Sequence, residues 1–306
     1  MTKIRIGTRG SPLALAQAHE TRRRLMAAHG LPEEEFEIVV ITTTGDRIRD
    51  RPLSEIGGKG LFTKEIEEAL FAREIDLAVH SMKDMPAVLP DGLAFAATLP
   101  REDARDALIS LSATSLQDLK LGATLGSSSV RRTAQALRLR PDLKVVQFRG
   151  NVETRLRKLA EGVADASFLA VAGLNRLGLS HHIAAVVPME EMLPAIAQGA
   201  IGIEIHAGNA RIHTMLDAIN HVETATAIAC ERAFLAALDG SCRTPIAGHA
   251  RLADGVLRFR GETLTLDGSK VFTAERSGAP ADAAQMGTDA AAEVKAKGGS
   301  LIVGAA

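Results

Sequence analysis

The chain has 306 residues, of which 46% are apolar and 24% charged, and its formal net charge at pH 7 is −1. A chain of this length is longer than one that folds around a single hydrophobic core, so two or three domains are expected. The near-neutral charge excludes a globally basic nucleic-acid binder, and no apolar run reaches the roughly 18 residues that a transmembrane helix needs. The first residues enter a strand-like pattern directly, which argues against a signal peptide. We therefore expect a soluble, cytoplasmic protein.

The first third of the chain alternates short β-branched runs with helical runs, which predicts an α/β domain with a largely parallel sheet. Strands are expected at residues 3–8, 36–43 and 75–80. Ser11 is a suitable N-cap and Pro12 a suitable first helical residue, so a helix is predicted at residues 12–29.

A second βα series follows a charged segment at residues 100–106, which is predicted to be a linker. Its strands are expected at residues 121–125, 144–149 and 167–172, each followed by a turn and a helix. The turns are Gly126-Ser-Ser-Ser129, Gly150-Asn151 and Gly173. A further strand at residues 201–205 is predicted to return to the first domain.

The last third differs, because Asp254-Gly255 and Asp267-Gly268 are strong hairpin signals. Helices are predicted at residues 225–238 and 280–297, so this region is expected to be α+β. The predicted domains are residues 1–99 with 200–217, residues 105–193, and residues 221–306.

Basic residues are concentrated in one stretch despite the balanced total. Residues 126–160 contain nine Lys or Arg and only two acidic residues, Asp142 and Glu153. A solvated helix face explains any single arginine. However, Arg131 and Arg132 lie in the first turn of a predicted helix, where the helix dipole disfavours cations unless an anion is near. Because ligands of open α/β sheets bind at strand exits, we expect a small polyanion, a polycarboxylate or phosphate compound, there.

The first domain has polar groups at matching positions. Arg9 and Ser11 follow its first strand, and Lys83 and Asp84 follow the strand at 75–80. A loop aspartate is usually a cap or turn residue, but a carboxylate at a strand exit can also stabilise a developing cation. His80 has no second ligand at metal-binding spacing, so it is predicted to be structural.

The two cysteines have different surroundings. Cys230 lies within a predicted helix beside apolar positions and should pack in the core. Cys242 follows that helix, and the adjacent Arg243 would favour its thiolate, so an inert thiol and a nucleophile are equally compatible with its position. Neither a disulfide framework nor a zinc site is expected, and no Walker A, Gly-x-Gly-x-x-Gly or Gly-x-Ser-x-Gly motif is present.

Several long segments together resemble the porphobilinogen deaminase family. The similarity extends over nearly the whole chain, and Ser241 replaces a glycine that is common in the family. The matching segments are residues 4–16, 57–62, 78–84, 101–103, 126–132, 149–155, 169–174 and 198–199, and the loop with Cys242.

The resemblance implies a transferase of tetrapyrrole and haem biosynthesis. Such an enzyme joins four porphobilinogen molecules head to tail, releases ammonia and yields the linear tetrapyrrole hydroxymethylbilane. It implies two α/β domains of the periplasmic-binding-protein-like type facing a cleft, plus a smaller C-terminal α+β domain. It also implies a dipyrromethane cofactor attached through a thioether to Cys242, and a monomer without metal, nucleic-acid or membrane partners.

The resemblance also implies roles for individual residues. Asp84 would stabilise charge in the chemical step, Arg9 would deliver a proton to the leaving amine, and Lys59 would belong to a mobile lid. The implied cofactor-binding residues are Cys242, Lys83, Asp84, Ser129, Arg131, Arg132 and Arg155. The implied residues for porphobilinogen and the growing polypyrrole chain are Arg9, Ser11, Arg149, Asn151, Arg155, Arg176 and Gln198.

Two other classes of function compete with this interpretation. A two-domain binding protein for an anionic metabolite would share the basic strand exits but would leave the Cys242 loop unexplained. An RNA-binding or regulatory module would use the basic stretch, but the chain has no Trp or Tyr for base stacking.

Overall fold

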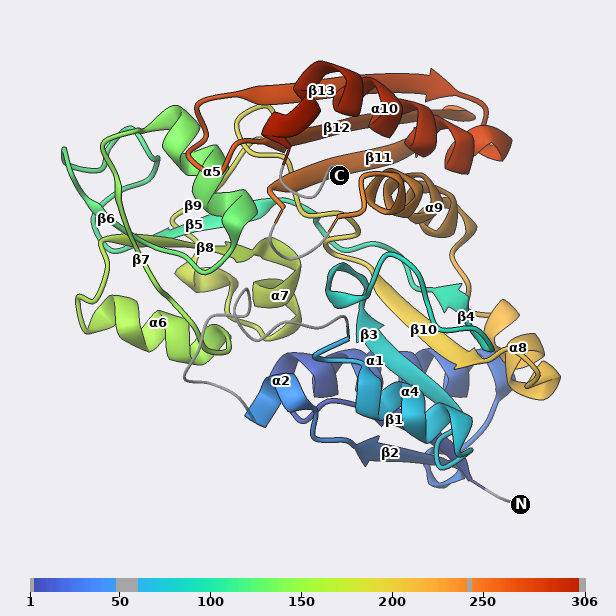
Figure 1. The fold of residues 1–306 in the computed structure, drawn as a ribbon. Helices are drawn as coiled ribbons and strands as arrows, with labels where there is room; N and C mark the ends of the chain where they lie inside the picture. The colour runs from blue at the N-terminus through green and yellow to red at the C-terminus, as the bar shows by residue number, and fades with distance from the viewer. Residues whose placement is uncertain (1–2, 48–59, 241–243, 303–306) are drawn as a thin grey trace. The chain divides into compact units, whose positions relative to one another are not determined.

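The computed structural model describes residues 3–47, 60–240 and 244–302 (Figure 1). By its internal contacts the chain forms two compact units. The first unit comprises Met1–Glu102 and Gly199–Ala225, and the second comprises Asp103–Gln198 and Thr226–Ala306. The predicted division into three domains stays a prediction.

The first unit is built on a five-stranded mixed sheet of order β2-β1-β3-β10-β4. Its strands are β1 (Ile4–Thr8), β2 (Phe36–Val40), β3 (Leu77–Ser81), β4 (Leu93–Thr98) and β10 (Ile201–His206). The predicted parallel pairing is confirmed for β1 with β2 and with β3. The strand predicted to return at 201–205 is β10, which runs antiparallel to β3 and β4. β10 follows a long excursion of the chain, so no βαβ crossover fixes its direction.

Helices pack against this sheet and bury its apolar residues. They are α1 (Pro12–His29), α4 (Lys64–Phe71) and α8 (Ala210–Asp217). The unit also contains the short helix α2 (Thr44–Arg47) and the 3-10 turns η1 (Glu33–Glu35) and η2 (Met82–Asp84). The predicted helix at 12–29 is confirmed, and Ser11 caps it by accepting a 3.3 Å hydrogen bond from the Ala14 amide. Gly30 ends it with φ of +63°, a conformation that favours glycine.

The second unit contains another five-stranded mixed sheet, of order β7-β6-β8-β5-β9. Its strands are β5 (Asp106–Ser110), β6 (Thr124–Gly126), β7 (Lys144–Val146), β8 (Ala166–Ala170) and β9 (Ala185–Val186). β6 pairs in parallel with β7 and β8, as predicted, whereas β5 is antiparallel to β8 and β9.

Several predicted boundaries in the second unit are wrong. The strand predicted at 121–125 is β6, which begins at Thr124, and the strand predicted at 144–149 is β7, which ends at Val146. The linker predicted at 100–106 ends too late, because Asp106 begins the buried strand β5. The strand predicted at 167–172 ends at Ala170, and the helix starts at once. The helices here are α5 (Val130–Leu139), α6 (Val152–Ala160) and α7 (Val171–Arg176), followed by the turn η3 (Ser180–His182).

The C-terminal part of the second unit is an antiparallel sheet covered by helices. β11 (Ile246–Ala253), β12 (Val256–Leu264) and β13 (Val271–Gly278) pair in chain order, as the hairpin signals predict. The helical elements are α9 (Val222–Ala237) and α10 (Ala283–Gly298), with short turns η4 (Pro280–Asp282) and η5 (Gly299–Leu301).

The two long C-terminal helices approach each other closely. A Cβ at Gly287 of α10 would lie 2.1 Å from the Cys230 carbonyl oxygen of α9, so this contact requires glycine. Cys230 is fully buried, as predicted, and burial raises the pKa of its thiol to about 12. This thiol is therefore inert.

Within the described ranges, no helix is long and apolar enough to span a bilayer, and no group of three His, Cys, Asp or Glu side chains is arranged to hold a metal ion.

Candidate functional site

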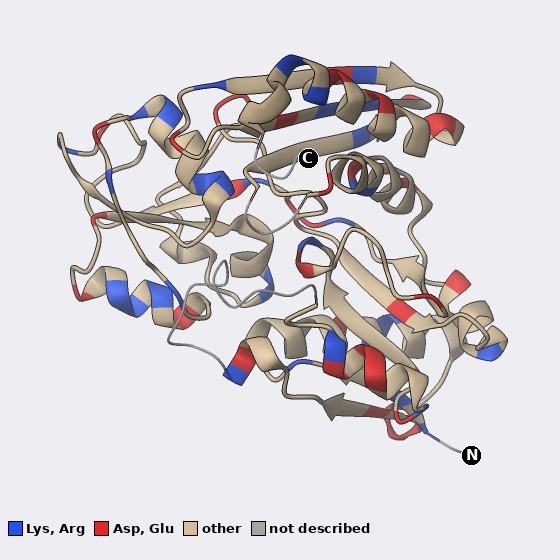
Figure 2. Cartoon of the chain, viewed as in Figure 1, with Lys and Arg blue, Asp and Glu red and all other residues tan. Residues whose placement is uncertain are grey.

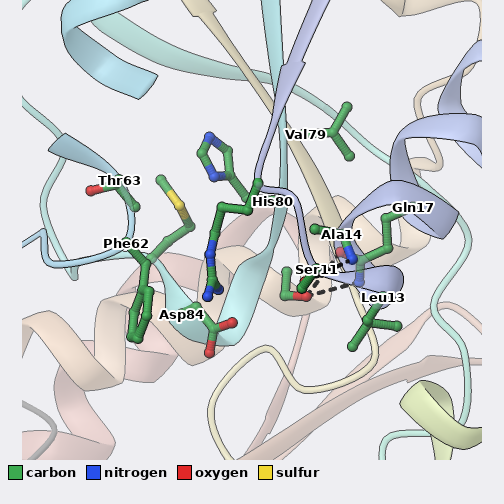
Figure 3. Close-up of a pocket in the computed structure, with 12 residues that line it drawn as sticks. Ser11, Leu13, Ala14, Gln17, Phe62, Thr63, Val79, His80 and Asp84 are labelled. Carbon is green, nitrogen blue, oxygen red and sulfur yellow. Dashed lines mark hydrogen bonds between the residues drawn. The ribbon is translucent and has the colours of Figure 1, made fainter. Parts of the chain in front are cut away.

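The first unit has a small pocket where β1 and β3 end. Its volume is about 60 Å³, and its lining includes Arg9, Ser11, His80 and Asp84. Figure 3 shows the Asp84 side chain between those of Phe62 and Ser11. The structure thus brings together the residues that the sequence placed at two separate strand exits.

Arg9 is held in place by two neighbours that sequence reasoning did not identify. Its Nε donates to Asp46 Oδ2 at 3.1 Å, and its Nη2 donates to Asp46 Oδ1. The Phe62 ring centroid lies 4.2 Å from Arg9 Cζ, within the range of a cation–π contact. The signal for Asp46 was its position after Gly45, just beyond the second predicted strand.

Asp46 is an anion whose charge is well stabilised. Burial would raise the pKa of this carboxyl group, but the hydrogen bond and charge of Arg9 and a hydrogen bond from Thr43 outweigh it and lower the pKa. The Thr43 hydroxyl lies 2.8 Å from Asp46 Oδ2. Arg9 therefore has two of its three guanidinium nitrogens occupied and can present Nη1 to a ligand.

Asp84 is exposed, although its short turn η2 is anchored in the interior. Met82, in the same turn, is buried, and its amide donates to the Ala200 carbonyl oxygen at 3.0 Å. A Cβ at Gly202 of β10 would lie 1.9 Å from Met82 Sδ, so the absence of a side chain at Gly202 makes room for this methionine. The burial of Met82 leaves Lys83 and Asp84 facing outward.

The residue before this turn is fastened to α1. Gln17 Nε2 donates to Ser81 Oγ at 2.8 Å, and Ser81 Oγ donates back to Gln17 Oε1 at 3.0 Å. Gln17 is buried, so its orientation is fixed. The strand end that carries Asp84 therefore has a defined position relative to the helix that Ser11 caps.

His80 has the structural environment that was predicted. It is buried in β3, and its Nε2 lies 3.1 Å from Oε2 of Glu204, a fully buried residue of β10. Burial raises the pKa of the nearby Glu67, with the negative charge of Glu204 adding to this effect and Thr63 opposing it. The His80–Glu204 contact therefore links β3 to β10.

Arg131 and Arg132 have an anion beside them, and it belongs to the chain itself. Arg131 Nη1 donates to Asp106 Oδ2 at 2.7 Å, and Arg132 Nη2 donates to Asp106 Oδ1 at 2.6 Å. Further donors from these guanidiniums reach the carbonyl oxygens of Leu193 and Phe168. The exposed fractions are 5% for Arg131, 7% for Arg132 and 0% for Asp106.

Gln198 completes this group, which we call the Asp106 cluster (Asp106, Arg131, Arg132 and Gln198). Its Nε2 donates to Asp106 Oδ1 at 3.0 Å and to the Ala104 carbonyl oxygen at 2.7 Å. The side chain is fully buried, so the described contacts give Gln198 a structural role. Burial would raise the pKa of Asp106, but the two arginines hold it well below its usual range.

Ser129 and Asn151 are N-caps, a role that the sequence analysis did not assign to them. Ser129 Oγ accepts from the Arg132 amide at 3.4 Å, and Asn151 Oδ1 accepts from the Thr154 amide at 2.9 Å. Capping occupies an oxygen lone pair but no hydrogen. The Ser129 hydroxyl and the Asn151 amide nitrogen therefore remain donors at helix N-termini, where carboxylates are favoured.

Three further arginines that were predicted to bind the cofactor or substrate are half-buried. Arg149 Nη1 is buried without a hydrogen-bond partner, which is the condition of a donor awaiting an acceptor. Arg155 Nε donates to the Gly150 carbonyl oxygen at 2.9 Å. Arg176 ends α7. Cys242 and Lys59 lie outside the described residues.

Comparison with known proteins decides the family. A model of the porphobilinogen deaminase dipyromethane cofactor-binding domain matches residues 4–214, and a model of the porphobilinogen deaminase C-terminal domain matches residues 225–296. The chain belongs to the porphobilinogen deaminase family. It is 61% identical over 294 residues to the porphobilinogen deaminase of Paracoccus denitrificans, covering 96% of this chain and 94% of that protein.

Two solved structures show a weaker similarity to this chain. A periplasmic substrate-binding protein of an ABC transporter from Coxiella burnetii is 16% identical, with a TM-score of 0.44 over 71% of this chain and 91% of that one. The methionine-binding protein MetQ is 14% identical, with a TM-score of 0.44 over 71% and 89%. These similarities concern the fold alone.

Proposed function

We propose that this chain condenses porphobilinogen head to tail into the linear tetrapyrrole hydroxymethylbilane, releasing ammonia, and that Asp84 acts in the chemical step. The observation that carries the proposal is the exposed Asp84 carboxylate at a pocket that Arg9 also lines. The family match over residues 4–214 supports it, since the matched segment contains both residues.

Asp84 suits a reaction in which positive charge develops on the substrate. When ammonia leaves porphobilinogen, the pyrrole and its exocyclic carbon become electron-poor. A fixed carboxylate stabilises that charge and accepts a hydrogen bond from the pyrrole N–H. The buried Met82 and the Gln17–Ser81 contacts keep the Asp84 turn in place before the reaction.

Arg9 suits the carboxylates of porphobilinogen, which carries one acetate and one propionate. Asp46 occupies Nε and Nη2 of Arg9, so Nη1 is oriented without a further loss of conformational freedom. Proton delivery by Arg9 to the leaving amine stays a prediction, and a guanidinium with its high pKa is better suited to binding an anion.

The described residues fit a dipyrromethane cofactor, because its carboxylates require N–H and O–H donors. The unpartnered Arg149 Nη1 and the donors of Ser129 and Asn151 meet that need. When bound, the cofactor supplies a primer to which substrate units are added. Cys242 would hold it through a thioether, and Lys83, Asp84, Ser129 and Arg155 would orient it.

Arg131 and Arg132 are also proposed to contact the cofactor, but their first partner is Asp106. Arg176 and Ser11 are proposed to bind substrate carboxylates, and substrate binding by Gln198 stays a prediction. We further propose that the protein acts as a cytoplasmic monomer.

Intact-protein mass spectrometry tests the covalent attachment. The purified chain should exceed its sequence mass by two porphobilinogen units less two ammonia molecules, and Cys242→Ser should lack this excess and consume no porphobilinogen. Cys230→Ser is the matched control and should keep the added mass, because the buried Cys230 thiol has a raised pKa. An unmodified wild-type chain with full activity would exclude the thioether.

A further inference from the structure

One face of the C-terminal sheet is basic, and Arg251 and Arg258 on it are exposed. In β12, Phe259 points toward α9, where its ring lies 5.1 Å from that of Phe234. Side chains alternate along a strand, so the neighbouring Arg258 and Arg260 point to the opposite face. Figure 2 shows basic segments on β11, β12 and β13.

Strand register brings the basic residues of this face together. Arg251 of β11 is directly opposite Arg258 of β12, and His249 is opposite Arg260. Ser277 and Glu275 of β13 flank Arg258 and Arg260 on the other side. These six residues, which we call the basic face, line a groove of about 440 Å³.

The Arg251–Arg258 pair has no counter-charge. Like charges directly opposite on neighbouring strands destabilise a sheet. Neither guanidinium has an ion pair or hydrogen bond within the described ranges, and both side chains are exposed. By contrast, two other arginines of the same unit have acidic partners, Arg157 with Glu161 at 2.7 Å and Arg140 with Asp142 at 2.7 Å.

The acidic groups near the basic face do not neutralise it. Glu275 and Glu262 each lie 3.9 Å from Arg260, at the outer limit of an ion pair. Asp103 already pairs with Arg105 at 2.6 Å, and His249 interacts with it electrostatically. The face therefore carries uncompensated positive charge at Arg251 and Arg258.

We propose that the basic face is a second anion-binding site, for a small molecule that carries two or more separate carboxylate groups. The groove volume falls within the range of small-molecule sites, about 300–1,000 Å³. Arg258 and Arg260 are two residues apart on one strand, which separates their backbones by about 6.6 Å. That spacing suits several anionic groups on one molecule, and each planar guanidinium can bind one carboxylate bidentately.

A nucleic acid fits this face less well. Phe259 is the only Phe, Tyr or Trp among the residues that line the groove, and it is only 2% exposed, so the groove offers no such ring for base stacking. The inference goes beyond the proposed function, since none of the residues of the basic face lines the pocket that contains Asp84.

Isothermal titration of the full-length protein with citrate, at constant ionic strength, tests the site. Arg251→Gln/Arg258→Gln should weaken the binding of citrate at least tenfold. Its thermal stability should not fall, because the variant removes a like-charge contact. The matched control, Arg23→Gln/Arg211→Gln, removes the same net charge from exposed positions of α1 and α8 and should keep the wild-type affinity.

Both double variants should consume porphobilinogen at the wild-type rate, so failure of this site and failure of the proposed function are distinguishable. Citrate binding to other basic sites is common to all three proteins and cancels in the comparison. Equal citrate affinity in wild type and Arg251→Gln/Arg258→Gln would overturn the proposal. Arginine-dependent binding of a DNA oligonucleotide or an acidic peptide that citrate does not displace would also overturn it.

Discussion

At the scale of single residues, a side chain that resembles a ligand-binding group often has a structural partner as well. Arg9 donates to Asp46, and Arg132 donates to Asp106. Asp84 differs from both arginines because it is exposed and its position is maintained by the buried Met82. A change at Asp84 should therefore affect chemistry far more than folding.

Asp84→Asn should lower kcat for porphobilinogen consumption by roughly 10²–10³-fold, because an amide cannot balance the developing positive charge. The free energy of unfolding should change by less than about 0.5 kcal/mol, as is usual for an exposed side chain. Steady-state kinetics and urea unfolding measure the two effects. Asp91→Asn, also exposed in the same unit, is the control, and equal rates in the two variants would give Asp84 a structural role.

At the scale of secondary-structure elements, the strand-to-helix turns have two functions. Ser11, Ser129 and Asn151 each accept a hydrogen bond from an amide in the first turn of the following helix, α1, α5 or α6. Each also stands at an N-terminus with a partial positive charge. A substitution that keeps the cap but changes the charge can separate these two functions.

Asn151→Asp should preserve the cap of α6, because Asp is as good an N-cap as Asn, but it should repel substrate carboxylates. We expect an unchanged free energy of unfolding and a KM for porphobilinogen raised several-fold. Asn151→Ala should instead cost about 1 kcal/mol of stability. If Asn151→Asp left KM at the wild-type value, Asn151 would be a cap and not a ligand.

At the scale of the whole molecule, the Asp106 cluster ties separate parts of the second unit to one another. It joins β5 and α5 to the segment that contains Leu193 and Gln198. Glu231 of α9 makes a similar link, accepting from the amides of Ala197 at 2.6 Å and Ala250 at 2.7 Å. The buried carboxylates of Asp106 and Glu231 thus connect β5 and β11, respectively, to the segment that contains Ala197 and Gln198.

The cluster predicts acid sensitivity. The folded-state pKa of Asp106 is lowered, so its contribution to stability is present above the unfolded pKa of about 4 and is lost as the pH falls through the folded pKa. Asp106→Asn should cost about 3–5 kcal/mol at neutral pH, since it leaves two buried arginines without their anion.

Urea unfolding at several pH values measures this dependence. The gap in the free energy of unfolding between wild type and Asp106→Asn should narrow as the pH drops below about 4. If the variant does not fold, the wild type alone should lose stability over this pH range. A wild-type stability that stays constant down to about pH 2 would contradict the assignment.

Local sequence determined much of this protein. The helix at 12–29, the return of the chain at 201–206, the C-terminal hairpins and the burial of Cys230 all follow from caps, turn residues and apolar periodicity, which act between near neighbours. The strand-exit positions of Arg9, Asp84, Ser129 and Asn151 could be predicted in the same way, and their motifs identified the family.

Tertiary structure alone decided the pairings between distant residues. Nothing local in the sequence indicates that Asp106 neutralises Arg131 and Arg132, that Asp46 and Phe62 hold Arg9, or that β10 runs antiparallel to β3. In the unfolded chain a charged side chain is surrounded by water and has no fixed partner. Folding excludes that water, and the strands that become neighbours then determine which side chain is the partner. The identity of the counter-ions in a site therefore depends on residues that are distant in the sequence, whereas the position of a residue at a strand exit depends on its near neighbours.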